Sequence, residues 1–399
     1  MTIMVQKFGG TSVQDDESRR AALKHVKYSV DKGYQVVVVV SAIGRQGAPY
    51  ATDSLLGLVD GEQSLLSNRE LDMIVSVGET ISAAVFSELL NKEGIKAAAL
   101  TGQDAGVETN DEFQNAKVVN INTDLIYEAF NTADVLVVTG FQGATSQGQT
   151  TTIGRGGSDT TAALLGAALD AERVDIFTDV SGMMTADPRL VTKAKFLETV
   201  SYEEVANMAH EGAKVIHPRA VEIAQQAHVP VRIRSTWQGP EEMGTLVTDR
   251  NLGVKHYRSV TGIAHVTGLT QFTIKTNNHT AKDVFNLMAD NHLSVDFINI
   301  SPGKVIFNLL SDDVDKAKRL LSEAKIDVSI LANCAKVSIV GAGMTGTPGV
   351  TSKIVTALAE NDINILQTTD SYTTIWILVQ QDDLKTAVNA LHEVFLNNI

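Results

Sequence analysis

From the N-terminus to about residue 249, short runs of β-branched residues alternate with longer amphipathic segments. The runs include MVQKFG, YQVVVVVSA, IKAAAL, ADVLVVTGF and VDIFTDV, and a helix is predicted from about Asp16 to Lys32 after the first of them. Runs without polar alternation are typical of strands buried on both faces of a parallel sheet. Five consecutive valines, with Gly44 just beyond them, favour a strand over a buried helix. The pattern predicts a three-layer α/β/α sandwich with a mainly parallel sheet.

The pattern changes after a polar and basic stretch, TDRNLGVKHYRSVTG, which predicts a connector. Beyond it, AKDVFNLMADNHLSVDFINIS from Ala281 aligns without gaps on TSKIVTALAENDINILQTTDS from Thr351, an offset of 70 residues. Each copy predicts a strand, a helix, two strands and a helix, which is a small α+β unit with an antiparallel sheet. The predicted domains are therefore 1–249, a linker at 250–262, and two repeats at 263–332 and 333–399.

Composition and charge narrow the class of protein. The chain has 399 residues, 44% hydrophobic and 20% charged, which is typical of a folded multidomain protein. A net charge of −14 without a dense basic run disfavours nucleic acid and anionic membranes as partners. The N-terminus has no signal-peptide pattern and no stretch approaches about 20 uninterrupted apolar residues, so a cytoplasmic location is expected. Cys334, the single cysteine, is expected to be a small core residue.

The first candidate site is the turn VQKFGGTSV after the first predicted strand. Gly9 and Gly10 let the backbone approach a ligand closely, and Thr11 and Ser12 place hydroxyls beside a helix N-terminus, as in phosphate cradles. Lys7 adds a charge that can follow phosphoryl oxygens during transfer. The turn is neither a Walker loop nor a Gly-x-Gly-x-x-Gly fingerprint, which disfavours P-loop and Rossmann folds.

The second candidate site is TTTIGRGGSDTTAALLGAA, a glycine-rich turn that leads into an apolar helix. Arg155 can bind a carboxylate through two hydrogen bonds, and the Gly156 and Gly157 amides can donate to a second anion. Asp159 can hold lysine side chains in position. Ser158 and Asp159 are expected to cap the helix that follows as well as to serve the site, and the alternative is that they only cap it.

The third candidate site is FTDVSGMMTADPRLV, where a predicted parallel strand ends in a turn. Thr178, Asp179, Asp187 and Arg189 could contact the base, ribose and phosphates of a nucleotide, because loops at this end of parallel strands commonly bind ligands. An ordinary loop interrupted by Pro188 is the alternative. Further along, Lys214 in HEGAKVIHPRA is either a second phosphate-binding lysine or a solvated helix residue.

Two smaller features complete the candidates. Thr52 and Asp53 lie in PYATDSLL, and Glu79 follows Gly78 in SVGETISAA. Glu79 could bind a substrate ammonium group. The alternative is that Glu79 lies near a helix start, where a carboxylate is favoured by the helix dipole regardless of function.

Taken together, KFGGTSV, VVSA, ATDSLL, VGE, GRGGSDTTA, TDVSGMMTADPR and GAKVIHPRA resemble, in this order, an aspartokinase of the amino-acid kinase family. The repeated unit resembles a tandem of ACT domains, which are ferredoxin-like. The sequence is most similar to the single-function bacterial enzymes, of the Bacillus kind inhibited by meso-diaminopimelate. The resemblance covers the whole chain.

The resemblance implies a role for each matching residue. It gives Lys7, Asp159 and Lys214 the catalytic roles. It gives ATP binding to Lys7, Phe8, Gly9, Gly10, Ser41, Thr178, Asp179, Met184, Thr185, Ala186, Asp187, Pro188, Arg189 and Lys214. It gives aspartate binding to Thr52, Glu79, Arg155, Gly156, Gly157 and Ser158. It gives effector binding to Met344, Thr345, Gly349, Val350, Asn364 and Ile365 in the second repeat.

The implied reaction is phosphorylation of the side-chain carboxylate of L-aspartate by ATP, with Mg²⁺ held mainly through ATP phosphates and no protein ligand assigned. A carboxylate is already a competent nucleophile, so charge neutralisation and positioning suffice. A homodimer through the ACT domains is expected, with diaminopimelate, lysine or threonine as effector. Another amino-acid kinase, of the acetylglutamate or glutamate 5-kinase type, and a non-catalytic ACT-based sensor are the alternatives.

Overall fold

The computed structural model describes residues 2–249, 259–275, 278–344 and 347–397. These residues form two compact units. The first contains the described residues up to Met183, Phe196–Ala209 and the chain from Lys214 to Asp249. The second contains Met184–Lys195, His210–Ala213 and the described residues from Ser259 onward. Two short segments of the N-terminal part of the sequence thus belong to the C-terminal unit.

The first unit contains most of the strands and helices that the N-terminal pattern predicts. Its strands are β1 (Ile3–Phe8), β2 (Gln35–Val40), β3 (Ala97–Leu100), β4 (Val107–Thr109), β5 (Val118–Ile121), β6 (Val135–Thr139), β7 (Gln142–Thr145), β8 (Thr150–Thr152), β9 (Arg173–Thr178), β10 (Thr199–Ser201), β11 (Val231–Ser235) and β12 (Thr245–Thr248). Its helices are η1 (Gly10–Ser12), α1 (Asp16–Asp31), α2 (Thr52–Gly57), η2 (Gly61–Gln63), α3 (Asn68–Lys92), α4 (Asp124–Ala129), α5 (Gly157–Ala168), α6 (Tyr202–His210) and α7 (Pro218–Gln226).

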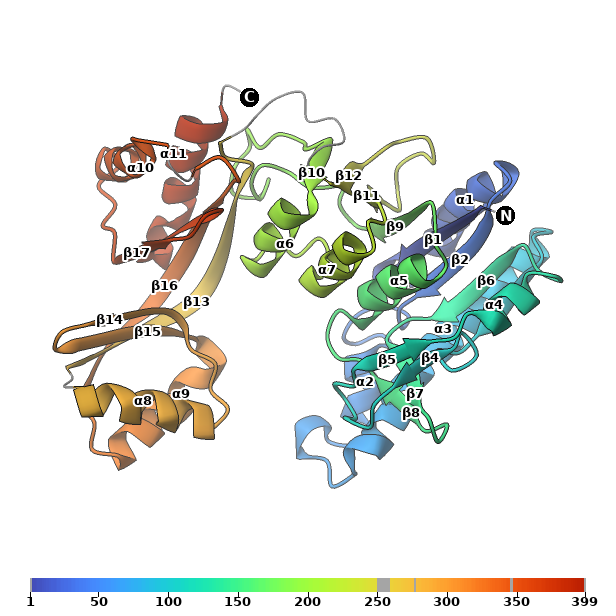
Figure 1. Ribbon diagram of the computed structural model, residues 1–399, viewed down its shortest axis with the longest axis horizontal. Helices are drawn as coiled ribbons and strands as arrows, with labels where there is room; N and C mark the ends of the chain where they lie inside the picture. Colours follow the sequence, from blue (N-terminus) through green and yellow to red (C-terminus); the bar gives the residue numbers. More distant parts are fainter. Residues whose placement is uncertain (1, 250–258, 276–277, 345–346, 398–399) are drawn as a thin grey trace. The chain divides into compact units, whose positions relative to one another are not determined.

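An eight-stranded sheet forms the middle layer of the first unit, in the order β10-β12-β11-β9-β1-β2-β6-β3 (Figure 1). The strands from β11 to β3 run parallel, and β12 is antiparallel to β11. Helices α1 and α3 pack on one face of the sheet, where they share a core with Phe8 and the valines of β2. Helices α5 and α7 cover the other face. The predicted three-layer sandwich with a mainly parallel sheet is confirmed.

Local sequence explains where the first helices begin. The Asp15 side chain accepts a hydrogen bond from the Ser18 amide at 2.8 Å and caps α1. A reciprocal pair between Ser67 and Glu70 caps α3. By length and composition, α3 alone among the described helices could cross a membrane, but half of its most apolar window is buried inside the unit, as in a core helix of a soluble protein.

A separate four-stranded sheet, in the order β5-β4-β7-β8, lies beside the main one. Its strands are only three or four residues long, which is too short for a clear hydrophobic pattern. Strand β8 ends two residues before Gly154, so this sheet positions the start of the GRGGSDT turn.

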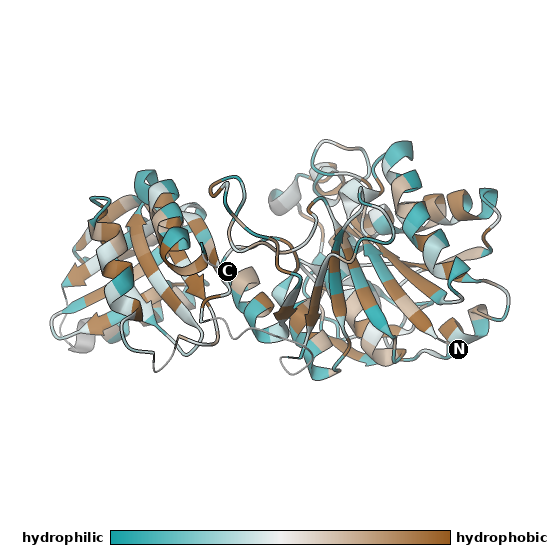
Figure 2. Ribbon diagram, turned by 90° about the horizontal axis from the view of Figure 1, so that it is seen from above, coloured by the Kyte–Doolittle hydropathy of each residue, from teal (hydrophilic) through white to brown (hydrophobic). Residues whose placement is uncertain are grey.

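The second unit is built around one six-stranded sheet, in the order β14-β15-β13-β16-β18-β17. Its strands are β13 (Gly262–Lys275), β14 (Asp296–Ser301), β15 (Lys304–Leu310), β16 (Val328–Val340), β17 (Gln367–Asp370) and β18 (Thr374–Gln380). Its helices are α8 (Asn278–Asp290), α9 (Ser311–Glu323), α10 (Val350–Ala359), η3 (Gln381–Asp383) and α11 (Leu384–Leu396). Hydrophobic residues follow the strands of both large sheets (Figure 2).

The two repeats share the long antiparallel pair β13 and β16. Residues 262–266 of β13 pair with residues 336–340 of β16, and Val260 and Ile263 pack in the same core as α10 and α11. The first five residues of β13 therefore complete the sheet of the second repeat, although they lie at the start of the first repeat in sequence. The predicted boundary at 263 follows the sequence repeat and not this pairing. Most of the predicted linker, 250–258, lies outside the described residues.

Candidate active site

Two adjacent cavities lie at the edge of the main sheet where its parallel strands end. The larger has a volume of about 1110 Å³ and the smaller of about 420 Å³. Lys7, Gly10, Ser41, Gly156 and Asp159 line both. These five come from the ends of β1 and β2 and from the start of α5, so three predicted motifs meet here.

The turn after β1 is tight, and Gly10 is required for it. A Cβ atom on Gly10 would lie 2.4 Å from the Gly44 carbonyl oxygen and 2.6 Å from that of Ala42. The Gly44 amide donates to the Gly10 carbonyl at 3.0 Å, and the Ser41 amide donates to the Phe8 carbonyl at 3.1 Å. The turn after β1 and the loop after β2 therefore form one backbone surface, as a phosphate cradle requires.

Lys7 and Asp159 form an ion pair at the junction of the two cavities. Lys7 Nζ lies 2.7 Å from Asp159 Oδ1, and each side chain is 13% exposed. Asp159 Oδ2 accepts a hydrogen bond from the His217 amide at 3.0 Å. One carboxylate thus joins β1, α5 and the segment that carries Lys214.

The interpretation of Ser158 and Asp159 as caps of the following helix is wrong. Helix α5 begins at Gly157, and its N-cap is Gly156 with a left-handed φ of 70° and no side-chain cap. A Cβ atom on Gly156 would lie 2.1 Å from the His217 ring, so the glycine also allows that ring to approach. Asp159 lies in the first turn of α5, and its oxygens bind Lys7 and the His217 amide instead.

Glu79 is buried in the wall of the larger cavity, and its side chain is 3% exposed. Oε1 accepts a hydrogen bond from the Ala42 amide at 3.0 Å, and Oε2 has no partner among the described residues. Burial raises the pKa of Glu79 to about 8 from its ordinary value of 4.5. Glu79 lies in the middle of α3, so the alternative that placed it near a helix start is wrong.

The remaining predicted substrate residues line the same cavity. Thr52 begins α2 and lies in this lining with Arg155, Gly156, Gly157 and Ser158. Arg155 is exposed and Ser158 is buried. The structure thus brings the predicted substrate residues together around one space.

Asp72 is a buried residue of this wall that the sequence analysis missed. Its carboxylate accepts hydrogen bonds from the Thr152 amide at 2.9 Å, the Thr152 hydroxyl at 2.7 Å and the Gln114 amide at 3.0 Å. Asp72 therefore ties α3 to β8, just before the Arg155 turn. The sequence could have indicated Asp72 through its spacing from Glu79, because residues seven apart lie on the same face of a helix.

The smaller cavity contains the predicted nucleotide residues Thr178, Asp179 and Lys214. Thr178 ends β9, and Lys214 follows α6 and is exposed. An ion pair of 3.2 Å joins Asp179 to Arg45 across the mouth of this cavity, and both side chains are largely exposed. The two lysines and the glycine turn therefore surround the same space.

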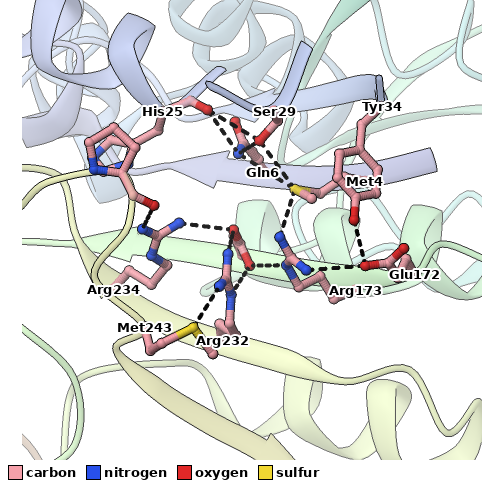
Figure 3. Close-up of polar contacts among 12 residues, drawn as sticks. Met4, Gln6, His25, Ser29, Tyr34, Glu172, Arg173, Arg232, Arg234 and Met243 are labelled. Atoms are coloured by element: carbon pink, nitrogen blue, oxygen red, sulfur yellow. Dashed lines mark hydrogen bonds and ion pairs between the residues drawn. The ribbon is translucent and has the colours of Figure 1, made fainter. Parts of the chain in front are cut away.

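A buried cluster of charges that the sequence analysis did not identify lies on the neighbouring strands β9 and β11 (Figure 3). Asp175 is fully buried, and Arg232 forms two hydrogen bonds to it, at 2.8 and 2.5 Å. Arg234 and Arg173 each lie 3.3 Å from its carboxylate. Burial alone would raise the pKa of Asp175, but its hydrogen bonds to Arg232 and the arginine charges hold the pKa below its usual value.

The cluster extends towards the nucleotide side through Phe177. The Arg234 guanidinium lies 5.2 Å from the centre of the Phe177 ring, and the His25 ring lies 4.5 Å from it. His25 Nε2 lies 3.1 Å from the Thr236 carbonyl oxygen, and burial, with the charge of Arg234, lowers the pKa of His25 to about 4. His25 is therefore neutral at physiological pH, and it supports the end of β9.

Comparison with known proteins agrees with this geometry. The amino acid kinase family matches residues 2–235, and an ACT domain matches residues 329–393. Aspartokinase 1 of Bacillus subtilis is 55% identical over 402 residues, which cover 99% of each chain. The chain belongs to the aspartokinases. The aspartokinase of Geobacillus stearothermophilus is 39% identical over 99% of this chain and 97% of its own.

Solved aspartokinase structures have the same fold. Escherichia coli aspartokinase III in complex with aspartate and ADP, described as the R-state, matches with a TM-score of 0.79 and 27% identity over 98% of this chain and 99% of its own. The same enzyme with lysine and aspartate, described as the T-state, matches with a TM-score of 0.77 and 27% identity over 99% of each chain. The predicted resemblance to the aspartokinases, with their kinase and ACT domains, is confirmed.

The segment 184–189 of this aspartokinase, which is predicted to bind ATP, does not lie with the other predicted ATP-binding residues in the first unit. Residues 184–189 belong to the second unit. The Thr185 hydroxyl lies 2.9 Å from His392 Nε2 and accepts a hydrogen bond from the Lys195 amide at 2.8 Å, and Ala186 packs in the core of the second repeat. Asp187 forms an ion pair of 2.7 Å with Arg189. Nucleotide binding by this segment, Met184 and Pro188 included, stays a prediction.

The predicted effector residues lie around the start of α10. Met344 and Val350 are buried in the core of the second repeat, and Ile365 packs against that core. Gly349 caps α10 with a φ of 93°, and Asn364 is exposed. Thr345 lies outside the described residues. An effector role for these residues stays a prediction.

Within the described ranges, no three His, Cys, Asp or Glu side chains are grouped so that they could hold a metal ion, so no dedicated metal site is found there. Cys334 is buried, as expected for a small core residue.

Proposed function

We propose that this aspartokinase transfers the γ-phosphoryl group of ATP to the side-chain carboxylate of L-aspartate, producing ADP and 4-phospho-L-aspartate. The Lys7–Asp159 ion pair at the junction of the two cavities is the observation that carries the proposal. A substrate carboxylate in the larger cavity and a triphosphate in the smaller one would meet there. Escherichia coli aspartokinase III has been crystallised with aspartate and ADP, which supports this pair of ligands.

Aspartate has complementary partners in the larger cavity. Arg155 can bind the α-carboxylate through two hydrogen bonds, and Ser158 and Thr52 offer hydroxyl groups. The ammonium group would pair with the Glu79 oxygen that has no partner among the described residues. Pairing offsets the cost of a buried carboxylate, so it also makes Glu79 ionise.

The nucleotide would lie in the smaller cavity. The amides of the Gly9 and Gly10 turn, with Ser41, can donate to phosphate oxygens, and Phe8 contributes backbone groups because its ring is buried. Thr178 and Asp179 lie where the base or ribose would bind. Mg²⁺ would be held mainly by the phosphate oxygens and would neutralise their charge.

The chemical step needs positioned charge and no general base, because a carboxylate is already nucleophilic. Lys7 is held by Asp159 at the point of transfer, and Lys214 supplies a second cation on the nucleotide side. Both cations stabilise the negative charge on the equatorial oxygens in the transition state.

The ACT repeats are proposed to bind an amino-acid effector and to pair two subunits in a cytoplasmic homodimer. Escherichia coli aspartokinase III has been crystallised with lysine, and diaminopimelate, lysine and threonine are the candidates for this chain. No nucleic acid or membrane partner is expected from the net charge of −14.

The test is ADP release from MgATP with L-aspartate, L-glutamate or N-acetylglutamate as acceptor, for the wild type and for Arg155→Ala. Turnover that depends on aspartate and is lost in the variant is expected. Turnover with another acceptor would contradict the substrate assignment and would favour the acetylglutamate or glutamate 5-kinase alternative. ATP binding without turnover would favour a non-catalytic sensor.

A further inference from the structure

The segment His210–Ala213 connects two parts of the catalytic unit but belongs to the second unit. It begins with the last residue of α6 and immediately precedes Lys214, which lines the nucleotide cavity. Three residues after Lys214, the His217 amide donates to Asp159. A change in the position of this segment would therefore be transmitted along four residues of chain to Lys214.

The segment is held in the second unit by the carboxylate of Glu211. Glu211 Oε2 lies 3.1 Å from Lys336 Nζ and accepts a hydrogen bond from the Ser338 hydroxyl at 2.7 Å. Lys336 and Ser338 both belong to β16, the strand shared by the two repeats. The side chains of Glu211 and Lys336 are only 12% and 7% exposed, so solvent screens their interaction little.

Lys336 also contacts the first repeat. Its Nζ lies 2.6 Å from Asp296 Oδ2 at the start of β14. Burial alone would lower the pKa of Lys336, but Asp296 and Glu211 raise the pKa above its usual value, so the lysine stays charged. One buried cation thus joins the first repeat, β16 of the second repeat and the segment before Lys214.

The backbone of the segment fits closely against β13. Gly212 has a φ of 105°, and a Cβ atom there would lie 2.2 Å from the His265 carbonyl oxygen. A glycine is therefore needed at this position, both for its backbone conformation and for its close approach. Side-chain and backbone contacts thus both attach the segment to the central strands of the ACT repeats.

We propose that Glu211 is a positioning residue for Lys214, and that its ion pair with Lys336 transmits the state of the ACT repeats to the nucleotide-binding residues. When effector binding shifts β16, the Glu211 carboxylate follows Lys336, and the start of the Lys214 segment shifts with it. The inference rests on the proposed function, because it takes Lys214 as a nucleotide-binding residue.

The test compares Glu211→Gln, Lys336→Met and the double variant with two matched controls. Glu393→Gln removes a carboxylate that pairs with Lys193 on the surface of the same unit, and Lys318→Met removes a surface lysine of α9. KM for ATP, kcat and the half-maximal inhibitory concentrations of meso-diaminopimelate, L-lysine and L-threonine are measured for each. Binding of a non-hydrolysable ATP analogue is measured by calorimetry.

Glu211→Gln and Lys336→Met are each expected to raise KM for ATP, to lower kcat because Lys214 also stabilises the transition state, and to shift the inhibition midpoint by at least about fivefold. The double variant should resemble the single variants, because both remove the same pair. A purely structural role would lower the amount of folded enzyme without changing KM or the inhibition midpoint. Circular dichroism measures the folded fraction.

The inference is overturned if both single variants keep the wild-type KM for ATP and inhibition midpoint, as the controls should. If Glu211→Gln does not fold, the same criterion applies to Lys336→Met, which retains the carboxylate. A wild type without aspartate-dependent turnover would contradict the proposed function itself. In that case, unchanged binding of the ATP analogue to Glu211→Gln would still overturn the positioning role.

Discussion

Lys7 and Asp159 are 152 residues apart in sequence, and their side chains meet at 2.7 Å between the two cavities. Asp159 also accepts a hydrogen bond from the His217 amide, so its two oxygens hold two different cation-bearing segments. Each oxygen thus has one partner within the protein. Asp159 is therefore best understood as the residue that fixes the geometry of Lys7 and of the Lys214 segment.

Asp159→Asn should lower kcat by about a hundredfold, because a neutral amide holds the ammonium group of Lys7 less tightly than the carboxylate does, and a displacement of about 1 Å at a reacting centre has that effect. KM for aspartate should change little, since other side chains are proposed to bind the substrate aspartate. Steady-state kinetics measure both. Asp16→Asn, which removes a carboxylate that is 82% exposed, is the matched control and should behave like the wild type.

Glu79 makes aspartate binding depend on pH. Its pKa of about 8 means that Glu79 is largely protonated at pH 7 in the free enzyme, whereas an ammonium group requires the carboxylate. KM for aspartate should therefore fall as pH rises towards 8, and binding at pH 7 should release a proton. Calorimetry in buffers of different ionisation enthalpy measures that proton. Binding without proton release would contradict the assignment of Glu79 to the ammonium group.

The same burial should cost stability in the ligand-free protein. Because the folded-state pKa of Glu79 lies above its unfolded value, the folded state binds more protons between about pH 4.5 and 8, and the stability contributed by Glu79 falls across that window. Glu79→Gln should therefore raise the melting temperature at pH 8 and have little effect near pH 4.5, while it abolishes aspartate binding. A lower melting temperature at pH 8 would indicate that the carboxylate stabilises the fold.

Much of the fold followed from sequence patterns because those patterns are local. The valines of β2, the helix α1 and the repeated ACT unit each have a periodicity that a short window contains. The four-stranded sheet was missed because β4, β5, β7 and β8 are only three or four residues long, too short to show a periodic pattern. The pairing of the first residues of β13 with the second repeat was missed because register between distant strands has no local signal.

In the candidate site, too, the features carried by local motifs were predicted and those that depend on distant residues were missed. Lys7, Gly10, Arg155 and Asp159 were identified because glycine-rich turns beside strands and helices are local motifs. Their convergence depends on β1 lying between β2 and β9 in the sheet, which no single motif specifies. Asp72 was missed because its partners, Gln114 and Thr152, lie 42 and 80 residues away.

Gly10 and Gly9 offer a matched pair of substitutions in the phosphate turn. Gly10→Ala should lower stability by about 1–3 kcal/mol and raise KM for ATP, because the new methyl group would overlap the Gly44 carbonyl. Gly9→Ala should leave the melting temperature near that of the wild type, since the nearest atom to its Cβ is Lys7 Nζ at 3.5 Å. Equal melting temperatures for the two variants would contradict the close approach of the two loops.

The buried cluster around Asp175 should stabilise the first unit without contacting substrate. Asp175→Asn leaves Arg232 and Arg234 buried with one neutral partner, and breaking such a pair costs about 3–5 kcal/mol. The melting temperature should therefore fall by about 6 °C or more. Glu172→Gln is the matched control, because Glu172 pairs with Arg173 but is 45% exposed, and its loss should cost less than about 1 kcal/mol.

Asp175→Asn should also affect ATP binding in the enzyme that remains folded. The cluster supports Phe177 and the end of β9. In folded Asp175→Asn enzyme, KM for ATP should therefore rise more above its wild-type value than KM for aspartate does. Thr178 and Asp179 follow Phe177 into the nucleotide cavity, whereas Glu79 and Arg155 belong to other elements. Assays below the transition temperature, corrected for the folded fraction, measure both constants. Equal changes in the two KM values would mean that the cluster supports the whole unit and not the nucleotide side in particular.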